Sequence, residues 1–170
     1  LGRVPINSCD FSLESYTFDE VKDDYDLLYF DTELTHDSSF MIPFMRRAMS
    51  AVLESSQGAN SLHFLASPWS PPKRMKQPIH GVQSMNGSAV PNGLQLDKKT
   101  LTTWAKYISK WVQAYSDKGV PIWAITPQNE PEFPAPWEAC AWSQTEMRDW
   151  IAKYLGPILK TAHPNMLILA

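Results

Sequence analysis

Short apolar runs of strand length alternate along the chain with longer segments of helical period. The runs cover residues 2–6, 62–66, 121–126 and 166–170. Parallel strands need a crossover of a dozen or more residues, usually a helix, so this alternation predicts parallel strands joined by helices. Because no G-x-G-x-x-G or P-loop motif supports a nucleotide-binding open sheet, the pattern favours an α/β fold that is part of a (β/α)8 barrel.

Three helices are expected between these strands. Asp37, Ser38 and Ser39 are predicted to cap a first helix over about residues 40–54. A second helix should begin at Asp97 and end at Gly119. Its apolar residues recur with helical spacing at Leu101, Trp104, Ile108, Trp111, Val112 and Tyr115. The spacing of a capping box over residues 143–146 predicts the start of the third helix.

Two long connections separate these elements. Residues 11–36 are rich in acids and aromatics, and their acidic side chains are expected to be solvated at the surface. The connection over residues 70–96 is long for a compact domain, and such loops are usually functional or disordered. It contains the sequence Asn86-Gly87-Ser88, which fits an N-glycosylation acceptor if the protein is secreted.

The charge and cysteine content exclude several classes of protein. The 170 residues carry a net charge of −3 with both signs interspersed, which does not suggest binding to nucleic acid. No apolar run approaches the roughly 18–20 residues of a membrane span. Cys9 and Cys140 are too few for a disulfide scaffold, and they either pair or remain thiols. Because both ends of the chain read as strands, a segment of a longer protein is expected.

Acidic, amide and aromatic residues directly follow the carboxyl ends of the first three predicted strands. Asp10 and Phe11 come after the first strand, Trp69 after the second, and Asn129 and Glu130 after the third. In a (β/α)8 barrel these positions lie together at the active-site face. Aromatic rings suit the apolar faces of pyranose rings, while carboxylates and amides bind their hydroxyl groups. The combination therefore predicts a sugar-binding site.

Glu130 is the candidate acid of this site. An acid placed directly after a buried strand can be partly withdrawn from water, which keeps it protonated near neutral pH and able to protonate a glycosidic oxygen. Asn129 beside it can bind a sugar hydroxyl. Glu132 is the rival acid but lies farther into the loop. Motifs of serine hydrolases and of metal sites are absent, and the four histidines are scattered.

The ordered motifs resemble those of glycoside hydrolase family 30. They are RVP at residues 3–5, SCDFS at 8–12, ASPWS at 66–70 and WAITPQNEP at 123–131, and the likeness extends over essentially the whole chain. Within that family the chain looks most like the glucosylceramidases. The resemblance implies a (β/α)8 barrel with an attached β-sandwich, of which residues 1–170 form about strands 2 to 5 of the catalytic barrel domain.

The resemblance also assigns roles to individual residues. Glu130 matches the general acid/base of a retaining mechanism, and Asn129 matches its partner that contacts the sugar. Asp10 matches a carboxylate that holds glucose hydroxyls, with Phe11 beside it. The aromatic lining of the glucose pocket is matched by Trp69, and through a small alignment gap by Trp137. The nucleophile glutamate is expected beyond residue 170, so the isolated chain is expected to be inactive.

Glucosylceramide is the first substrate that the resemblance implies, cleaved to glucose and ceramide without metal or organic cofactor. A β-1,6-glucanase of the same family is the alternative enzyme, and a carbohydrate-binding protein without turnover is the alternative outside enzymes. A basic stretch at residues 70–76, where the family often has an aromatic, leaves the aglycone open. The resemblance further implies a lysosomal or secreted protein that contacts a membrane peripherally through a glycolipid substrate.

Overall fold

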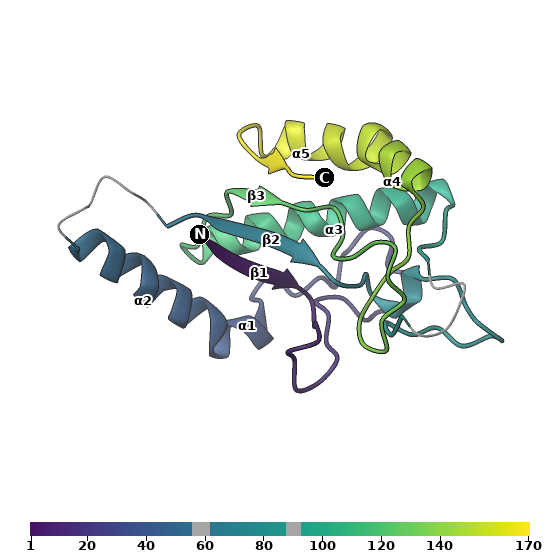
Figure 1. Cartoon of the computed structure of the whole chain (residues 1–170), viewed down its shortest axis with the longest axis horizontal. Helices are drawn as coiled ribbons and strands as arrows, with labels where there is room; N and C mark the ends of the chain where they lie inside the picture. The colour runs from purple at the N-terminus through teal and green to yellow at the C-terminus, as the bar shows by residue number, and fades with distance from the viewer. Residues whose placement is uncertain (56–61, 88–92) are drawn as a thin grey trace.

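The computed structural model describes residues 1–55, 62–87 and 93–170. Four parallel strands form one sheet whose spatial order is the order of the chain: β1 (Gly2–Ile6), β2 (Phe64–Pro68), β3 (Ala124–Ile125) and β4 (Leu167–Ile168) (Figure 1). Helices lie between successive strands. Consecutive parallel strands with helical crossovers are the repeating unit of a (β/α)8 barrel, so the predicted partial barrel is confirmed.

The crossovers contain seven helical segments in the described residues. They are α1 (Thr35–Ser39), α2 (Met41–Glu54), the short 3-10 turn η1 (Lys73–Met75), α3 (Lys98–Asp117), α4 (Gln144–Trp150), the π-helical turn η2 (Ile151–Leu155) and α5 (Gly156–Ala162). The last three run on from one another. In Figure 1 the long helix α3 lies behind the sheet, while the face toward the viewer carries none of the described helices.

Side chains of the strands alternate between these two faces. Val4, Ala66 and Ile125 lie side by side on neighbouring strands, and their side chains are buried in the core beneath the helices. α3 contributes large aromatic side chains to that core, Trp104 and Trp111 among them, and both are fully buried. The opposite face carries the residues between these core positions, and it is there that the polar side chains of the sheet gather.

Two of the predicted helix starts are confirmed with their caps. The side chain of Asp97 accepts a hydrogen bond from the backbone N–H of Thr100 at 3.0 Å, which satisfies one of the free donors of α3. Ser143 and Glu146 exchange hydrogen bonds as a capping box at the start of α4. Gly119 follows α3 with a φ of 78°, a conformation that glycine adopts without steric cost.

The predicted cap of α2 is wrong. α2 follows Phe40 without a side-chain cap, and Asp37 lies instead inside α1 with its carboxylate fully buried. That carboxylate accepts hydrogen bonds from the hydroxyl groups of Tyr16 and Tyr115 and contacts the ring of His36. Burial raises the pKa of both tyrosines well above the usual range, so both hydroxyls stay protonated and donate. Asp37 therefore joins residues 16–37 to α3.

The prediction that the acids of residues 11–36 are solvated is wrong for two of them. Asp19 and Asp24 are buried, whereas Glu20, Asp23 and Asp26 are exposed as expected. Asp19 pairs with the guanidinium of Arg74 at 2.7 Å, although burial outweighs this charge and raises the pKa of the carboxyl. Asp24 accepts a hydrogen bond from the backbone N–H of Tyr29. Asp19 thus ties the segment to η1, and α3 holds it as well, because Tyr107 accepts a hydrogen bond from the N–H of Phe18 and Thr103 donates one to the carbonyl oxygen of Tyr25.

Candidate active site

The three strand exits are tied together at the carboxyl end of the sheet. Asn7, directly after β1, has a φ of 68° and donates through its side-chain amide to the carbonyl oxygen of Ser70 at 3.0 Å. Gln128, after β3, donates to the carbonyl oxygen of Trp69 at 2.7 Å. The backbone N–H of Asn129 donates to the carbonyl oxygen of Pro68. These contacts extend the pairing of the strands into the loops that carry the predicted site residues.

Arg3 is the site residue that the sequence reasoning missed. It lies in the middle of β1, on the face opposite Val4, and its guanidinium group donates to Asn129 Oδ1 at 2.6 Å and to Ser67 Oγ at 3.0 Å. The same group lies 4.6 Å from the centre of the Trp69 ring. A charged residue inside a short, otherwise apolar strand is the signal that could have identified it, because a charge at such a position usually has a polar partner.

Asn129 connects Arg3 to the candidate acid. Its side-chain oxygen accepts from Arg3, and its amide nitrogen lies 3.4 Å from Glu130 Oε2. Trp69 beside them is 6% exposed. The structure therefore brings Trp69, Asn129 and Glu130 together as the sequence predicted and adds Arg3 to them. A carboxyl group next to an amide, a guanidinium and an aromatic ring can exchange a proton with a bound sugar while its neighbours hold the hydroxyl groups.

Glu130 itself differs from the prediction in its exposure. The strand end was expected to withdraw it from water, but in the structure the residue is exposed. Its φ is 44°, in the left-handed region that a non-glycine residue occupies at a steric cost. Glu132, the rival acid, is also exposed and accepts a long hydrogen bond of 3.4 Å from Gln144. Backbone conformation, rather than burial, separates the two acids.

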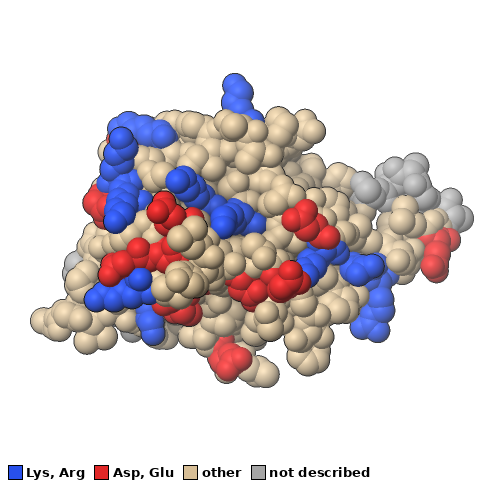
Figure 2. Space-filling model, turned by 180° about the vertical axis from the view of Figure 1, so that it is seen from behind, with Lys and Arg blue, Asp and Glu red and all other residues tan. Residues whose placement is uncertain are grey.

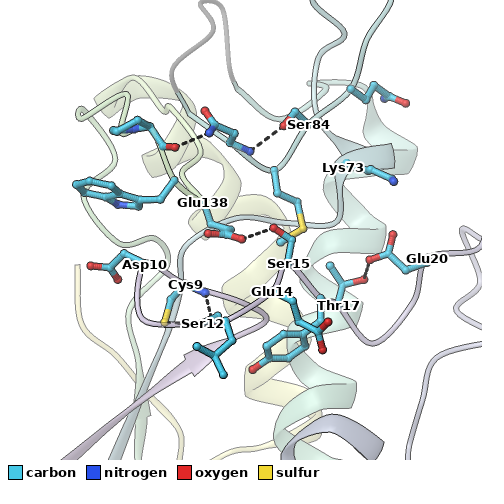
Figure 3. Close-up of a pocket in the computed structure, with 17 residues that line it drawn as sticks. Cys9, Asp10, Ser12, Glu14, Ser15, Thr17, Glu20, Lys73, Ser84 and Glu138 are labelled. Carbon is cyan, nitrogen blue, oxygen red and sulfur yellow. Dashed lines mark hydrogen bonds between the residues drawn. The ribbon is translucent and has the colours of Figure 1, made fainter.

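Asp10 and Phe11 lie in the loop after β1, and Trp137 lies in the loop after β3. Asp10 and Trp137 line an open pocket of about 1090 Å³, which Figure 3 shows with its side chains. Phe11 is 85% exposed. Their assignment to the sugar site stays a prediction.

A buried lysine fixes one wall of that pocket. Lys76 is fully buried, and its ammonium group donates to the carbonyl oxygens of Met85, Asn86 and Ala139. Burial lowers the pKa of Lys76 to about 8, so the group is still protonated at neutral pH. Because Met85 and Asn86 belong to the connection after β2 and Ala139 to the connection after β3, Lys76 joins the two loops.

Replacing Lys76 with Met should lower the free energy of unfolding of the whole protein by about 2 kcal/mol, because buried carbonyl oxygens lose their donor. The loss is measured by chemical denaturation. Lys73→Met is the matched control, since Lys73 is exposed in the same segment, and it should change stability by less than about 0.5 kcal/mol. Equal losses in the two variants would contradict the role of Lys76 as the link between the loops.

The two cysteines and the predicted glycosylation sequence also lie in this region. Cys9 and Cys140 are both free and buried, and burial raises the pKa of Cys140 to about 12. Asn86 donates its side-chain amide to the carbonyl oxygen of Pro136, while Ser88 of the glycosylation sequence lies outside the described residues. The described part of the long connection forms two isolated bridges with the loop after β3, one between Asn86 and Glu138 and one between Gly93 and Ala141.

Charged side chains of both signs are mixed on the surface. Lys and Arg side chains are interspersed with Asp and Glu over the face seen in Figure 2, so that face has no large patch of one sign. In the part of the chain that the structure describes, no group of three or more His, Cys, Asp or Glu residues could hold a metal ion. None of the helices in residues 1–55, 62–87 and 93–170 has both the length and the apolar character that crossing a bilayer requires.

Sequence comparison finds relatives of known family. The model of the glycosyl hydrolase family 30 TIM-barrel domain matches residues 1–170. Putative glucosylceramidase 3 of Caenorhabditis elegans is 38% identical over 164 residues, which are 94% of this chain and 29% of the relative. Lysosomal acid glucosylceramidase of Mus musculus is 29% identical over 98% of this chain and 31% of the relative. Endo-1,6-beta-D-glucanase of Neurospora crassa is 33% identical over 94% of this chain and 31% of the relative.

Two solved structures superpose on nearly the whole chain. SrfJ from Salmonella typhimurium superposes with a TM-score of 0.79 at 29% identity, over 98% of this chain and 34% of that one. The endo-beta1,6-glucanase BT3312 superposes with a TM-score of 0.78 at 27% identity, over 99% of this chain and 34% of that one. The chain thus spans about three tenths of the length of the curated relatives it matches.

Proposed function

The chain belongs to glycosyl hydrolase family 30, and from that premise we propose that its whole protein is a retaining β-glucosidase whose first substrate is glucosylceramide. Family membership makes glycoside hydrolysis the class of reaction. The observation that carries the proposal for this site is the contact series from Arg3 through Asn129 to Glu130 at the carboxyl end of the sheet. The names of the worm and mouse relatives support glucosylceramide as the substrate.

In the proposed mechanism Glu130 acts twice. As a carboxylic acid it protonates the glycosidic oxygen while a second glutamate, expected outside residues 1–170, attacks the anomeric carbon. The resulting Glu130 carboxylate then takes a proton from a water molecule while the water oxygen attacks the anomeric carbon. The bond between that carbon and the second glutamate breaks, and glucose is released. Asn129, held by Arg3, binds a sugar hydroxyl, and Trp69 and Asp10 complete the glucose site. The reaction needs no metal or organic cofactor. Residues 1–170 alone are proposed to be inactive because a retaining site needs both carboxylates.

A β-1,6-glucanase is the second candidate. The Neurospora crassa relative and the endo-beta1,6-glucanase BT3312 favour it, because both match nearly the whole of this chain. The two candidates share the glucose site and differ in the group on the other side of the scissile bond. That group is a ceramide in one case and a further sugar in the other.

Hydrolysis by the whole protein decides between the candidates. Purified protein is given glucosylceramide in mixed micelles and, separately, a soluble β-1,6-glucan, and released glucose or glucan fragments are quantified. We expect a higher kcat/KM for glucosylceramide. Faster cleavage of the glucan would select the glucanase, and binding of either glycoside without any turnover would select the carbohydrate-binding protein. With glucosylceramide as substrate, a lysosomal or secreted location and peripheral contact with a membrane follow as parts of the same proposal.

A further inference from the structure

The direction of the Glu130 side chain is set by its backbone more than by its own contacts. The residue is exposed, and among the described residues only the side-chain amide of Asn129 donates to its carboxylate, at a long 3.4 Å from Oε2. A change of φ from 44° to the extended region would turn the Cα–Cβ bond by at least about 100° around the N–Cα axis. The contacts that hold this φ therefore decide where the carboxyl group lies.

Pro131 removes one of the common alternatives for this backbone. The ring of a proline clashes with a right-handed helical conformation of the residue before it, which here is Glu130. The extended conformation stays open, and for a residue with a Cβ atom it is less strained than the left-handed one. Some further contact must therefore hold Glu130 in the left-handed region.

Hydrogen bonds hold the chain on both sides of Glu130. On the carboxyl side, the carbonyl oxygen of Glu130 accepts a hydrogen bond from the N–H of Phe133 at 3.0 Å. On the amino side, the N–H of Asn129 donates to the carbonyl oxygen of Pro68 at 2.8 Å. The peptide group that joins Asn129 to Glu130 lies between these two fixed points. Its orientation relative to the Glu130 Cα atom is what φ measures.

The side chain of Gln128 holds that peptide group. Its Nε2 atom donates to the carbonyl oxygen of Asn129 at 2.9 Å and to that of Trp69 at 2.7 Å. The Asn129 carbonyl oxygen and the Glu130 nitrogen belong to one planar unit, so a contact at the oxygen restricts rotation of the whole plane. The second contact, to Trp69, anchors the amide of Gln128 at the exit of β2.

The amide of Gln128 is itself fixed in one orientation. The residue is 6% exposed, and its Oε1 atom is buried without a hydrogen-bond donor among the described residues. The reversed amide would place that oxygen against two carbonyl oxygens, which accept hydrogen bonds and cannot donate them. The two N–H donations are therefore what this side chain contributes, and one of them ends on the peptide group that precedes the candidate acid.

We propose that Gln128 is a positioning residue for Glu130. Its amide holds the preceding peptide group, keeps Glu130 in the left-handed region and so directs the carboxyl group toward the glycosidic oxygen. The inference rests on the proposed function, in which Glu130 protonates that oxygen. Because Gln128 acts through Glu130, loss of its amide should slow the steps in which Glu130 transfers a proton.

The test compares two glucosides that depend differently on the acid, in the whole protein. kcat/KM is measured for octyl β-glucoside, whose leaving oxygen needs a proton, and for nitrophenyl β-glucoside, whose leaving oxygen needs little protonation. In Gln128→Met, the value for octyl glucoside divided by that for nitrophenyl glucoside should fall about tenfold, because a displaced acid loses part of its contribution. The ratio does not depend on the folded fraction of the preparation, so a loss of stability alone leaves it unchanged.

Two comparisons separate this effect from general damage. Gln95→Met is the matched control, because the Gln95 amide also donates to two backbone carbonyl oxygens but lies in the connection after β2. Its ratio should stay at the wild-type value. In a Glu130→Gln background no acid remains to be displaced, so adding Gln128→Met should change the rate on octyl glucoside by less than about twofold. A further loss of about tenfold in that background would overturn the proposal.

Gln128→Asn provides the result if Gln128→Met does not fold. It keeps the amide but is one methylene shorter, so it cannot reach both carbonyl oxygens, and the ratio should fall about threefold. An unchanged ratio in Gln128→Met, or in Gln128→Asn where only that variant folds, would overturn the proposal.

Failure of the proposed function would be recognised separately. If the wild type cleaves neither glucoside, the β-glucosidase assignment fails, and crystal structures of the wild type and of Gln128→Asn test the inference instead. A positive φ at Glu130 in the wild type and a negative φ in the variant would support the role of Gln128 in holding the backbone. The same sign in both structures would overturn it.

Discussion

Replacing Glu130 with Gln should lower kcat of the whole protein toward an alkyl β-glucoside by about 10²- to 10⁴-fold, the usual contribution of general acid–base catalysis. The amide keeps the size of the side chain and its distance from Asn129, but it cannot donate a proton to the leaving oxygen. The rate is measured as glucose released under saturating substrate.

The dependence on the leaving group identifies the role. A nitrophenyl glucoside has a leaving group that needs little protonation, so its first step should be slowed much less than that of the alkyl glucoside. Glu132→Gln is the matched control, because Glu132 is a second exposed acid of the same loop, and its kcat should stay within about twofold of the wild type. A loss in Glu132→Gln equal to that in Glu130→Gln, or a Glu130→Gln enzyme with full activity on the alkyl glucoside, would remove Glu130 from its role.

Replacing Asp37 with Ala should lower the free energy of unfolding by about 3 kcal/mol or more, the largest stability effect that we expect in this chain. The substitution removes the acceptor of two tyrosine hydroxyls and leaves a cavity where the carboxylate was. Tyr115 belongs to α3 and Tyr16 to the segment after β1. Without Asp37, the hydroxyl groups of both tyrosines would lose their acceptor in a largely apolar environment. Chemical denaturation of the whole protein, followed by tryptophan fluorescence, measures the change.

Asp26→Ala is the control for this prediction. Asp26 is an exposed acid of the same long segment, and its removal should change the free energy of unfolding by less than about 0.5 kcal/mol. Asp37→Asn should fall between wild type and Asp37→Ala, because one amide oxygen can accept from one tyrosine but not readily from both. Similar stabilities for Asp26→Ala and Asp37→Ala would show that the buried network contributes nothing.

The parts of the fold that depend on neighbours in the sequence were predictable. The capping box at Ser143 and the cap at Asp97 act within one helical turn, so their residue types and spacing contain the whole interaction. The order of the strands followed from apolar runs, but their bounds did not: β2 is shifted by two residues toward the carboxyl end, and β3 and β4 are two residues each, inside the longer runs predicted for them. The order of Trp69, Asn129 and Glu130 along the chain placed them at one edge, because parallel strands all end on the same side.

Interactions between distant residues were not predictable in this way. Asp37 fits the spacing of a helix cap, and its two tyrosine partners are 21 and 78 residues away in the sequence. Asp19 resembled its solvated neighbours, and its pairing with Arg74 depends on how the long segment folds over α3. Arg3 and Glu138 likewise acquire partners more than 60 residues away, which no local pattern records. Polar residues whose partners are distant in the sequence are therefore where the sequence-based predictions for this chain failed.

The left-handed backbone at Glu130 has a consequence for how this position changes over generations. Asparagine or glycine would adopt the same conformation with less steric cost, and neither carries a carboxyl group. Selection for stability alone would thus favour replacement of the glutamate, whereas selection for the proposed hydrolysis would keep it. Under the proposed mechanism, a descendant that no longer depends on hydrolysis should lose its acid at this position early without losing its barrel. The residue found there would then distinguish a working enzyme from a protein that keeps only the fold.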